Sequence, residues 1–246
     1  MPLLFSVILP VLHADGKLGE TLDSVASQAF EDLEVLVMDG GASPSTERLV
    51  QRSSLNEGGG LRYVGKPDQG IYDAMNEALD LASGRYIYFI GAGDTLRPHA
   101  LAAVRDQLPT NDSSLVYGNV MRGAQIYDGP FDAWRLCHRN ICHQAAFYGR
   151  DIFQLLGRFS LSYPACADWE FNMRCYGDSR IPKRYIETVV ADFEQGGLSS
   201  HGDPAFNRDH GRLIRRHLGL LPFLKWAMGV TKTRVIARLR HELPGK

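Results

Sequence analysis

The feature that most constrains this chain is a short, almost wholly apolar run at residues 85–90, which opens directly into Gly91-Ala92-Gly93-Asp94. Such a run is typical of a strand that helices cover on both faces. Just before it, residues 71–81 repeat apolar side chains at helical spacing, and Ser83-Gly84 predicts the end of that helix. A buried strand that delivers one carboxylate in a loop of small residues is how α/β sheets build ligand sites.

The same alternation of strand and helix runs through the first 94 residues. Ser43-Pro44 is typical of a helix N-cap followed by proline in the first turn. The alternation of strand and helix indicates a mostly parallel, doubly wound α/β sheet. The pattern predicts strands at 5–9, 33–38, 61–64 and 85–90, and helices at 17–29, 44–52 and 71–81.

After residue 95 the pattern becomes more varied. We expect one α/β domain at residues 1–204 and a basic, amphipathic helical tail at 205–246, because no linker is visible in the first 200 residues. The pattern predicts helices at 98–108, 151–156 and 167–176, strands at 115–117, 120–127, 141–148 and 185–190, and an irregular stretch at 128–142. His143-Gln144 is expected at the end of an apolar strand.

Composition narrows the class of protein. Hydrophobic residues make up 44% of the chain and charged residues 22%, as in ordinary globular proteins. No apolar run reaches the length of a membrane span, and residues 1–10 lack the basic start and cleavage site of a signal peptide. The four cysteines form no CxxC pair, so we expect reduced thiols, no zinc site and a cytoplasmic protein.

Charge is distributed unevenly along the chain. Residues 205–246 hold ten Lys or Arg and two acidic residues, a net charge of +8, whereas the whole chain carries −1. Trp226 lies among leucines and basic residues, a composition that suits an interfacial helix on an anionic membrane surface. Packing on the domain or formation of a homodimer is the alternative. No nucleic-acid-binding module is recognisable, so we expect no nucleic-acid partner.

Three acidic residues follow predicted strands: Asp39, Asp68 and Asp94. Because the carboxyl ends of parallel strands meet at one edge of a sheet, we expect these carboxylates to converge. Asp68 also comes just before a predicted helix, so it either caps that helix or contacts a ligand.

The motifs, taken in order, resemble family 2 glycosyltransferases of the GT-A fold, and among them bacterial exopolysaccharide enzymes of the colanic-acid cluster type. The resemblance covers residues 3–200. It rests on SVILP at 6–10, VMDGGAS at 37–43, DQGIYDAMN at 68–76, YFIGAGD at 88–94, HQA at 143–145 and GGLS at 196–199.

This resemblance implies an inverting transfer of a sugar from a UDP- or GDP-sugar to an acceptor hydroxyl. The expected acceptor is a saccharide or a lipid-linked saccharide in bacterial surface or exopolysaccharide synthesis. A diphosphate leaving group needs a divalent cation, Mn²⁺ or Mg²⁺, held by oxygen ligands. The acceptor hydroxyl needs a general base.

For the donor side, the resemblance places Asp94 at the last acid of the D-x-D motif, as the metal ligand, although Ala92 replaces the first acid. It makes Asp39 the contact to the nucleotide base. Asp73 and Asn76 face the same way on one helix, where they either contact the donor or make structural hydrogen bonds. The complete donor-binding set is Pro10, Asp39, Gly40, Asp68, Gly70, Asp73, Asn76, Gly93 and Asp94.

For the acceptor side, the resemblance makes Asp168 the general base, although Ala167 replaces the acid that usually precedes it. Glu170 is the alternative base. His143, Gln144 and Glu170 are expected on the acceptor or diphosphate side, and His201 as a second metal ligand.

The missing acids at Ala92 and Ala167 leave a second interpretation open. A catalytically impaired protein of the same fold could bind nucleotide sugars or act as a scaffold without transferring sugar.

Overall fold

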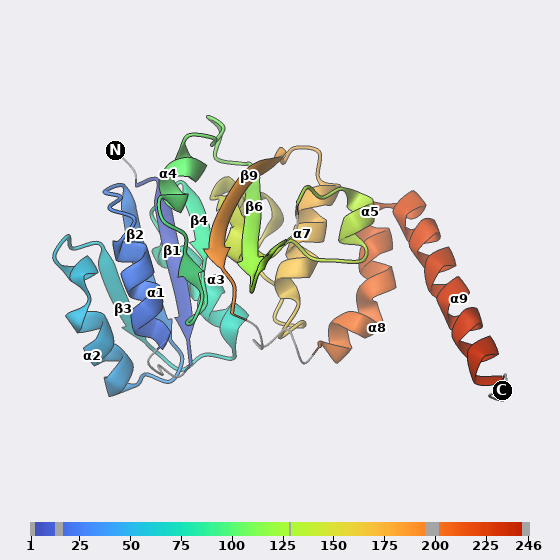
Figure 1. Cartoon of the computed structure of the whole chain (residues 1–246), viewed down its shortest axis with the longest axis horizontal. Helices are drawn as coiled ribbons and strands as arrows, with labels where there is room; N and C mark the ends of the chain where they lie inside the picture. Colours follow the sequence, from blue (N-terminus) through green and yellow to red (C-terminus); the bar gives the residue numbers. More distant parts are fainter. Residues whose placement is uncertain (1–2, 13–16, 128, 195–201, 243–246) are drawn as a thin grey trace.

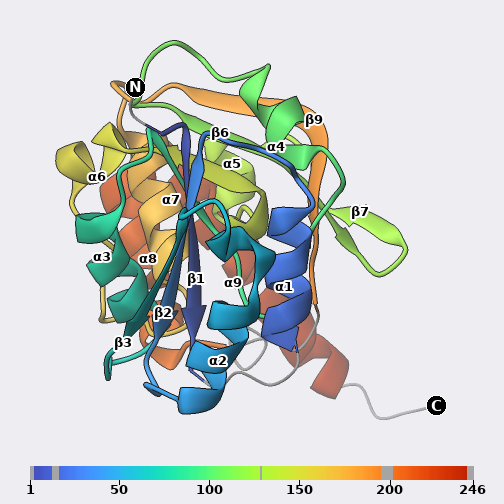
Figure 2. The ribbon, with the colours of Figure 1, turned by 90° about the vertical axis from the view of Figure 1, so that its left-hand side faces the viewer.

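A single mixed β-sheet, with helices on both faces, forms the centre of the molecule (Figures 1 and 2). The computed structural model describes residues 3–12, 17–127, 129–194 and 202–242, and only the backbone of 232–242. The strand order is β3-β2-β1-β4-β8-β6-β9-β5, and β7 pairs with β6.

The first half of the sheet is parallel, as the sequence predicts. Its strands are β1 (Phe5–Val11), β2 (Leu33–Asp39), β3 (Leu61–Gly65) and β4 (Tyr86–Phe89). The connecting helices are α1 (Lys17–Ala26), α2 (Pro44–Arg52) and α3 (Ile71–Leu81), with a short 3-10 turn, η1 (Ser54–Asn56), after α2. Ser43 caps α2, because its hydroxyl accepts from the Ser45 N–H at 3.3 Å. The predicted bounds of α2 and α3 are confirmed.

The second half turns the sheet into a mixed one. Its strands are β5 (Thr95–Leu96), β6 (Leu115–Arg122), β7 (Gln125–Tyr127), β8 (Ala146–Gly149) and β9 (Lys183–Asp192). Strand β8 is antiparallel to both β4 and β6, and β6 is parallel to β9. The strand pairs are therefore not mostly parallel across the whole sheet. The periodicity of the sequence does not predict whether neighbouring strands are parallel or antiparallel, because that depends on which distant strand becomes the neighbour.

Several predicted elements have other bounds in the structure, and two of them differ substantially. Residues 115–122 form one continuous strand, although a break was expected at Gly118-Asn119. Gly118 leaves room for the backbone of β9, and the pairing of β6 with β9 shifts in register at Asn119. The strand expected at 141–148 begins only at Ala146, because His143–Ala145 forms a 3-10 turn, η2. His143 and Gln144 therefore precede the strand and do not end it.

The remaining helices are α4 (Ala100–Arg105), α5 (Ala133–Leu136), α6 (Asp151–Leu156), α7 (Ala167–Gly177), α8 (Pro204–Leu213), a π-helical turn η4 (Ile214–Leu218) and α9 (Leu220–Glu242). Short helix α5 lies inside the stretch expected to be irregular.

Alternating side chains of the sheet build two apolar cores, one on each face. On β1, Ile8 faces the core shared with α3, α6, α7 and α8, whereas Val7 and Leu9 face the core shared with α1, α2 and α4. Both faces of the central strands are thus covered, as their continuous apolar runs predict.

The start of the tail packs on the domain through aromatic side chains. Trp169 of α7 contacts Phe206 of α8 with ring centroids 5.0 Å apart, and His210 contacts Trp226 of α9 at 5.4 Å. Farther along, α9 extends away from the sheet at one end of the molecule (Figure 1). Its exposed apolar side chains are Leu220, Leu221, Leu224 and Met228. No helix among the described residues is long and apolar enough to span a bilayer.

Candidate active site

Asp39 ends β2 and organises the loop that follows it. Its carboxylate is 1% exposed and accepts hydrogen bonds from the Gly41 N–H at 2.9 Å and the Ser43 N–H at 2.8 Å. The Tyr63 hydroxyl on β3 also donates to it, at 2.9 Å. Burial and the Asp39 carboxylate together raise the pKa of Tyr63 to about 12, so the phenol stays protonated. Asp39 therefore holds the shape of the loop at this sheet edge.

The Asp68 loop lies directly beside the Asp39 loop. A Cβ at Gly40 would collide with the Asp68 carboxylate, so glycine allows this close approach without displacing that side chain. Asp68 accepts from the Gly70 N–H at 2.8 Å, and Asp73 accepts from the Gln69 N–H at 2.9 Å. Gly70 has φ 121°, which favours glycine, and begins α3 without a side-chain cap. Asp68 and Asp73 thus shape the turn that leads into α3.

Two other predicted donor residues have mainly structural contacts. Asn76 is 8% exposed and pairs with the backbone of Phe159, whose carbonyl accepts at 2.9 Å and whose N–H donates at 3.0 Å. Pro10 is buried in β1, opposite Met38 of β2. For Asn76, the structure favours the structural alternative that the sequence left open.

Asp94 follows β4 in a loop of small residues, as predicted, and is 5% exposed. One oxygen, Oδ1, accepts from the Glu194 N–H at 2.8 Å, and Oδ2 accepts from the Gln144 amide at 2.6 Å. Burial raises the pKa of Asp94 despite these hydrogen bonds and the nearby imidazole of His143. A buried carboxylate of this kind gains stability from an additional positive charge.

Gly93, beside Asp94, lies beneath a pair of charged side chains. Its φ of 102° favours glycine, and a Cβ there would collide with the Glu194 carboxylate. Glu194 in turn forms an ion pair with Lys17 of α1 at 2.6 Å. The loop after β9 is thereby joined to the start of α1 across the Asp94 loop.

Two consecutive residues of η2 contact the predicted metal ligand Asp94 and the predicted base Asp168. Gln144 is 4% exposed, and the Cys142 thiol donates to its Oε1 at 2.9 Å, which directs its NH₂ group to Asp94. The imidazole Nδ1 of His143 lies 3.6 Å from Oδ2 of Asp168. The 3-10 turn therefore brings the environments of Asp94 and Asp168 together.

Asp168 lies in the first turn of α7 and is 8% exposed. Its Oδ1 accepts from the Tyr72 hydroxyl at 2.7 Å and from the Trp169 N–H at 2.9 Å. Its Oδ2 accepts from the Asn140 amide at 2.7 Å. Three fixed donors and His143 hold this carboxylate in one orientation, which is what a general base needs.

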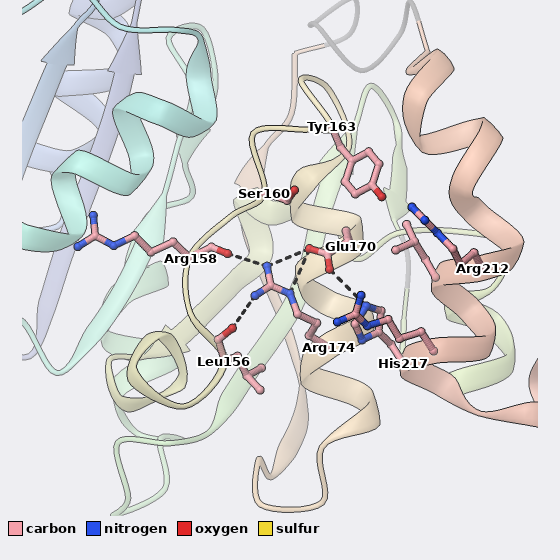
Figure 3. Close-up of a pocket in the computed structure, with 10 residues that line it drawn as sticks. Leu156, Arg158, Ser160, Tyr163, Glu170, Arg174, Arg212 and His217 are labelled. Atoms are coloured by element: carbon pink, nitrogen blue, oxygen red, sulfur yellow. Dashed lines mark hydrogen bonds and ion pairs between the residues drawn. The ribbon is translucent and has the colours of Figure 1, made fainter.

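Glu170 lies away from this group. Residues two apart on a helix point in nearly opposite directions, since each residue turns by about 100°. The Glu170 carboxylate instead pairs with Arg174 at 2.9 Å and lies 3.4 Å from His217 Nε2 of the tail (Figure 3). The expectation that Glu170 shares the site of His143 and Gln144 is therefore not supported by its contacts.

His201 lies outside the described residues, as does the GGLS motif at 196–199. Within the part of the chain that the structure describes, no three His, Cys, Asp or Glu side chains cluster as a metal site would require. Asp94 alone suits a hard cation that takes its other ligands from phosphate and water, because such cations keep several non-protein ligands.

Sequence reasoning missed the partners that hold the two carboxylates. Tyr72 lies inside the DQGIYDAMN motif, which could have drawn attention to it. Asn140 and Glu194 lie in segments without periodicity or a motif, so no signal in the sequence marks them.

Comparison with known proteins identifies the family. The model of the family described as glycosyl transferase family 2 matches residues 6–160. A PGL/p-HBAD biosynthesis glycosyltransferase from Mycobacterium tuberculosis is 41% identical over 203 residues, which are 80% of this chain and 79% of that protein. The chain belongs to glycosyltransferase family 2.

Solved structures show the fold of this glycosyltransferase. S. aureus TarS in complex with UDP-GlcNAc has a TM-score of 0.70 at 18% identity, covering 87% of this chain and 66% of that chain, slightly less than two thirds. A mannosyltransferase from Pyrobaculum calidifontis in complex with GDP-Man and Mn²⁺ has a TM-score of 0.63 at 17% identity, covering 94% and 79%. The predicted GT-A fold is confirmed.

Within the glycosyltransferase, the Asp39 loop, the Asp68 loop and the group around Asp94 and Asp168 lie along one edge of the sheet. The Asp39 and Asp68 loops meet at Gly40. Helix α3 then carries Tyr72 to Asp168, and η2 joins Asp168 to Asp94. The arrangement connects these loops to two buried carboxylates, Asp94 and Asp168, whose oxygens are held by hydrogen bonds.

Proposed function

We propose that this glycosyltransferase is an inverting enzyme that transfers a hexose from a UDP- or GDP-sugar to an acceptor hydroxyl. The observation that carries the proposal is the η2 turn, whose neighbouring residues His143 and Gln144 contact Asp168 and Asp94. This turn keeps a donor-side carboxylate and a base-side carboxylate at a fixed separation, as a direct displacement requires.

In this proposal Asp168 accepts the proton of the acceptor hydroxyl as that oxygen attacks the anomeric carbon. Attack from the side opposite the leaving diphosphate inverts the configuration at that carbon. Tyr72 and Asn140 donate to the two Asp168 oxygens and so aim the carboxylate. His143 adds a further polar contact, with its Nδ1 3.6 Å from Oδ2 of the carboxylate.

Asp94 is the proposed protein ligand of a divalent cation, Mn²⁺ or Mg²⁺, and His201 the proposed second one. The cation would offset the negative charge that develops on the diphosphate. Asp39, Gly40, Asp68, Gly70 and Gly93 shape the donor-side loops. The Pyrobaculum mannosyltransferase, solved in complex with GDP-Man and Mn²⁺, has the same fold, which supports a divalent cation as cofactor.

The proposed acceptor is a saccharide or lipid-linked saccharide, and the proposed location is the cytoplasmic face of the cell membrane. Leu220, Leu221, Leu224 and Met228 are exposed on α9, and the exposed Lys225 lies among them. Apolar side chains beside cationic ones favour contact with an anionic membrane surface. A homodimer through the same apolar face is the competing arrangement, which light scattering would reveal.

A thermal-shift panel of UDP- and GDP-sugars, with and without Mn²⁺, tests the donor assignment. We expect at least one nucleotide sugar to raise the Tm, and more so with Mn²⁺, because a ligand that binds only the folded state stabilises it. If no nucleotide diphosphate raises the Tm, the donor site is wrongly assigned.

The second candidate function is nucleotide-sugar binding without transfer, which the alanines at 92 and 167 favour. Asp168→Asn separates the two functions. For an enzyme, we expect the variant to bind the donor normally and to lose about 10²–10⁴-fold in kcat, the usual contribution of a general base. For a binding protein, the wild type itself transfers no sugar with any donor in the panel.

A further inference from the structure

A pocket of about 350 Å³ lies between α7 and the tail, outside the group formed by Asp94 and Asp168 (Figure 3). Three segments enclose it: the loop around residues 156–163, helix α7, and the end of α8 with η4. Its lining residues are Leu156, Arg158, Ser160, Tyr163, Glu170, Arg174, Arg212, Leu213, Arg216 and His217.

The acidic residue in this lining, Glu170, is engaged by Arg174 and His217. Arg174 donates to its Oε2 from Nε at 3.1 Å and from Nη2 at 2.9 Å, and His217 Nε2 lies 3.4 Å from its Oε1. Burial would raise the pKa of Glu170, but His217 and Arg174 outweigh burial and hold that pKa below its ordinary value. The negative charge of the lining is therefore already balanced.

Cationic groups remain in excess around the pocket. Arg212 and Arg216 lie four residues apart, a spacing that places side chains on one helix face. Arg212 donates to Asp209 at 2.9 Å through one nitrogen, and Arg216 has no ion pair or hydrogen bond among the described contacts. Arg158 pairs with Asp80, and its guanidinium points away from the pocket (Figure 3).

The backbone that carries Arg216 is held firmly in place. The π-helical turn Ile214–Leu218 packs on the end of α7, where a Cβ at Gly177 would collide with the His217 carbonyl. Leu213 and Ile214 on either side of the junction are buried. Because the backbone is fixed in this way, binding needs no ordering of the main chain, and the ordering cost is that of the arginine side chains.

We propose that this pocket binds a phosphate group, through Arg216 and Arg212, at a site separate from the proposed donor site. Guanidinium groups match phosphate oxygens with paired N–H donors, and the Ser160 hydroxyl adds a neutral donor to the same lining, whereas the Tyr163 hydroxyl already donates to Asp209 at 3.2 Å. The phosphate belongs either to a small soluble anion or to a phospholipid headgroup, since both present the same oxygens.

Calorimetric titration of the full chain with inorganic phosphate at low ionic strength tests the soluble source. Arg216→Ala should weaken binding about tenfold, the effect of one charge-assisted hydrogen bond. Arg215→Ala is the matched control, because Arg215 is exposed on the same turn but does not line the pocket. It removes the same charge and should leave the affinity within about twofold.

Co-sedimentation with vesicles tests the lipid source. If the pocket takes a headgroup, phosphatidic acid vesicles should bind the wild type about tenfold more tightly than they bind Arg216→Ala. Their affinity for Arg215→Ala should stay within about twofold of their affinity for the wild type. A difference between the two variants in either assay supports the pocket and names its source. Equal affinities of the two variants in both assays overturn the proposal, since binding then depends on general charge or on another site. Circular dichroism of both variants checks that the fold is intact.

Discussion

Tyr72 and Asp168, 96 positions apart in the chain, share a 2.7 Å hydrogen bond in the buried part of the site. Burial, and after it the Asp168 carboxylate, raises the pKa of Tyr72 well above its ordinary value. The phenol is therefore a permanent donor to the proposed base. This contact ties α3 to α7, the helix that carries the proposed base.

Tyr72→Phe removes this donor while keeping the ring that packs on Phe159 at 5.4 Å. We expect kcat to fall about tenfold, because the Asp168 carboxylate loses one of its fixed hydrogen bonds and part of its orientation. Tyr86→Phe is the control, since its hydroxyl bonds only to backbone carbonyls far from the site. Unchanged turnover in Tyr72→Phe would show that this contact is merely structural.

Asp94→Asn should change how stability depends on pH. The pKa of Asp94 is raised chiefly by burial, so the ionised form costs the folded state stability, and that cost disappears as pH falls through the folded pKa. We therefore expect the difference in Tm, variant minus wild type, to increase as the pH is raised from 4 to 7. The measurement is made without donor or cation. Parallel Tm curves across this range would contradict the raised pKa.

Glu170→Gln should show the opposite pH dependence. Because the pKa of Glu170 is lowered from 4.5, its stabilising effect is present above about pH 4.5 and is lost as pH falls through the folded pKa. At pH 7 we expect a loss of about 3 kcal/mol in the free energy of unfolding, as when one partner of a buried ion pair is removed. Urea unfolding at pH 7 and pH 3.5 measures the difference, and the exposed Glu187→Gln is the control.

His210 makes the packing of the tail sensitive to acid. Its Nε2 is buried without a hydrogen-bond partner among the described residues, and burial together with the His138 charge lowers its pKa from 6.5 to about 4. The unfolded chain therefore binds more protons below pH 6.5, and stability falls as pH falls, by up to about 1.4 kcal/mol per pH unit. His210→Phe keeps an aromatic ring between Phe206 and Trp226 and should flatten this dependence in urea unfolding between pH 5 and pH 7.5. An unchanged slope would place the acid sensitivity elsewhere.

Local patterns predicted the elements that depend on local forces. The bounds of α3 follow from apolar spacing at 71–81, and Ser43-Pro44 correctly marks the start of α2. Asp39 ends one buried strand and Asp94 follows another, close to where they were expected, because continuous apolar runs indicate strands and the next polar residue falls at the sheet edge. The family, and with it the GT-A fold, was also readable from the ordered motifs.

Long-range contacts were not readable in the same way. Nothing in the apolar run at 141–148 showed that its first residues form a 3-10 turn, or that the strand after it runs antiparallel to β4. Helical spacing placed Asn76 on the same face of the helix as Asp73. It could not show that the backbone of Phe159 would pair with the Asn76 amide.

The sequence by itself determined the family, the alternating α/β elements and the delivery of Asp94 by the buried strand at 85–90. Only the tertiary structure decided that Gln144 and His143 join Asp94 to Asp168, and that Glu170 is paired with His217 of the tail. The physical reason is that secondary structure follows from side-chain periodicity within a few residues. The partner of a buried charge, in contrast, depends on which distant segments the closed packing of both apolar cores brings together.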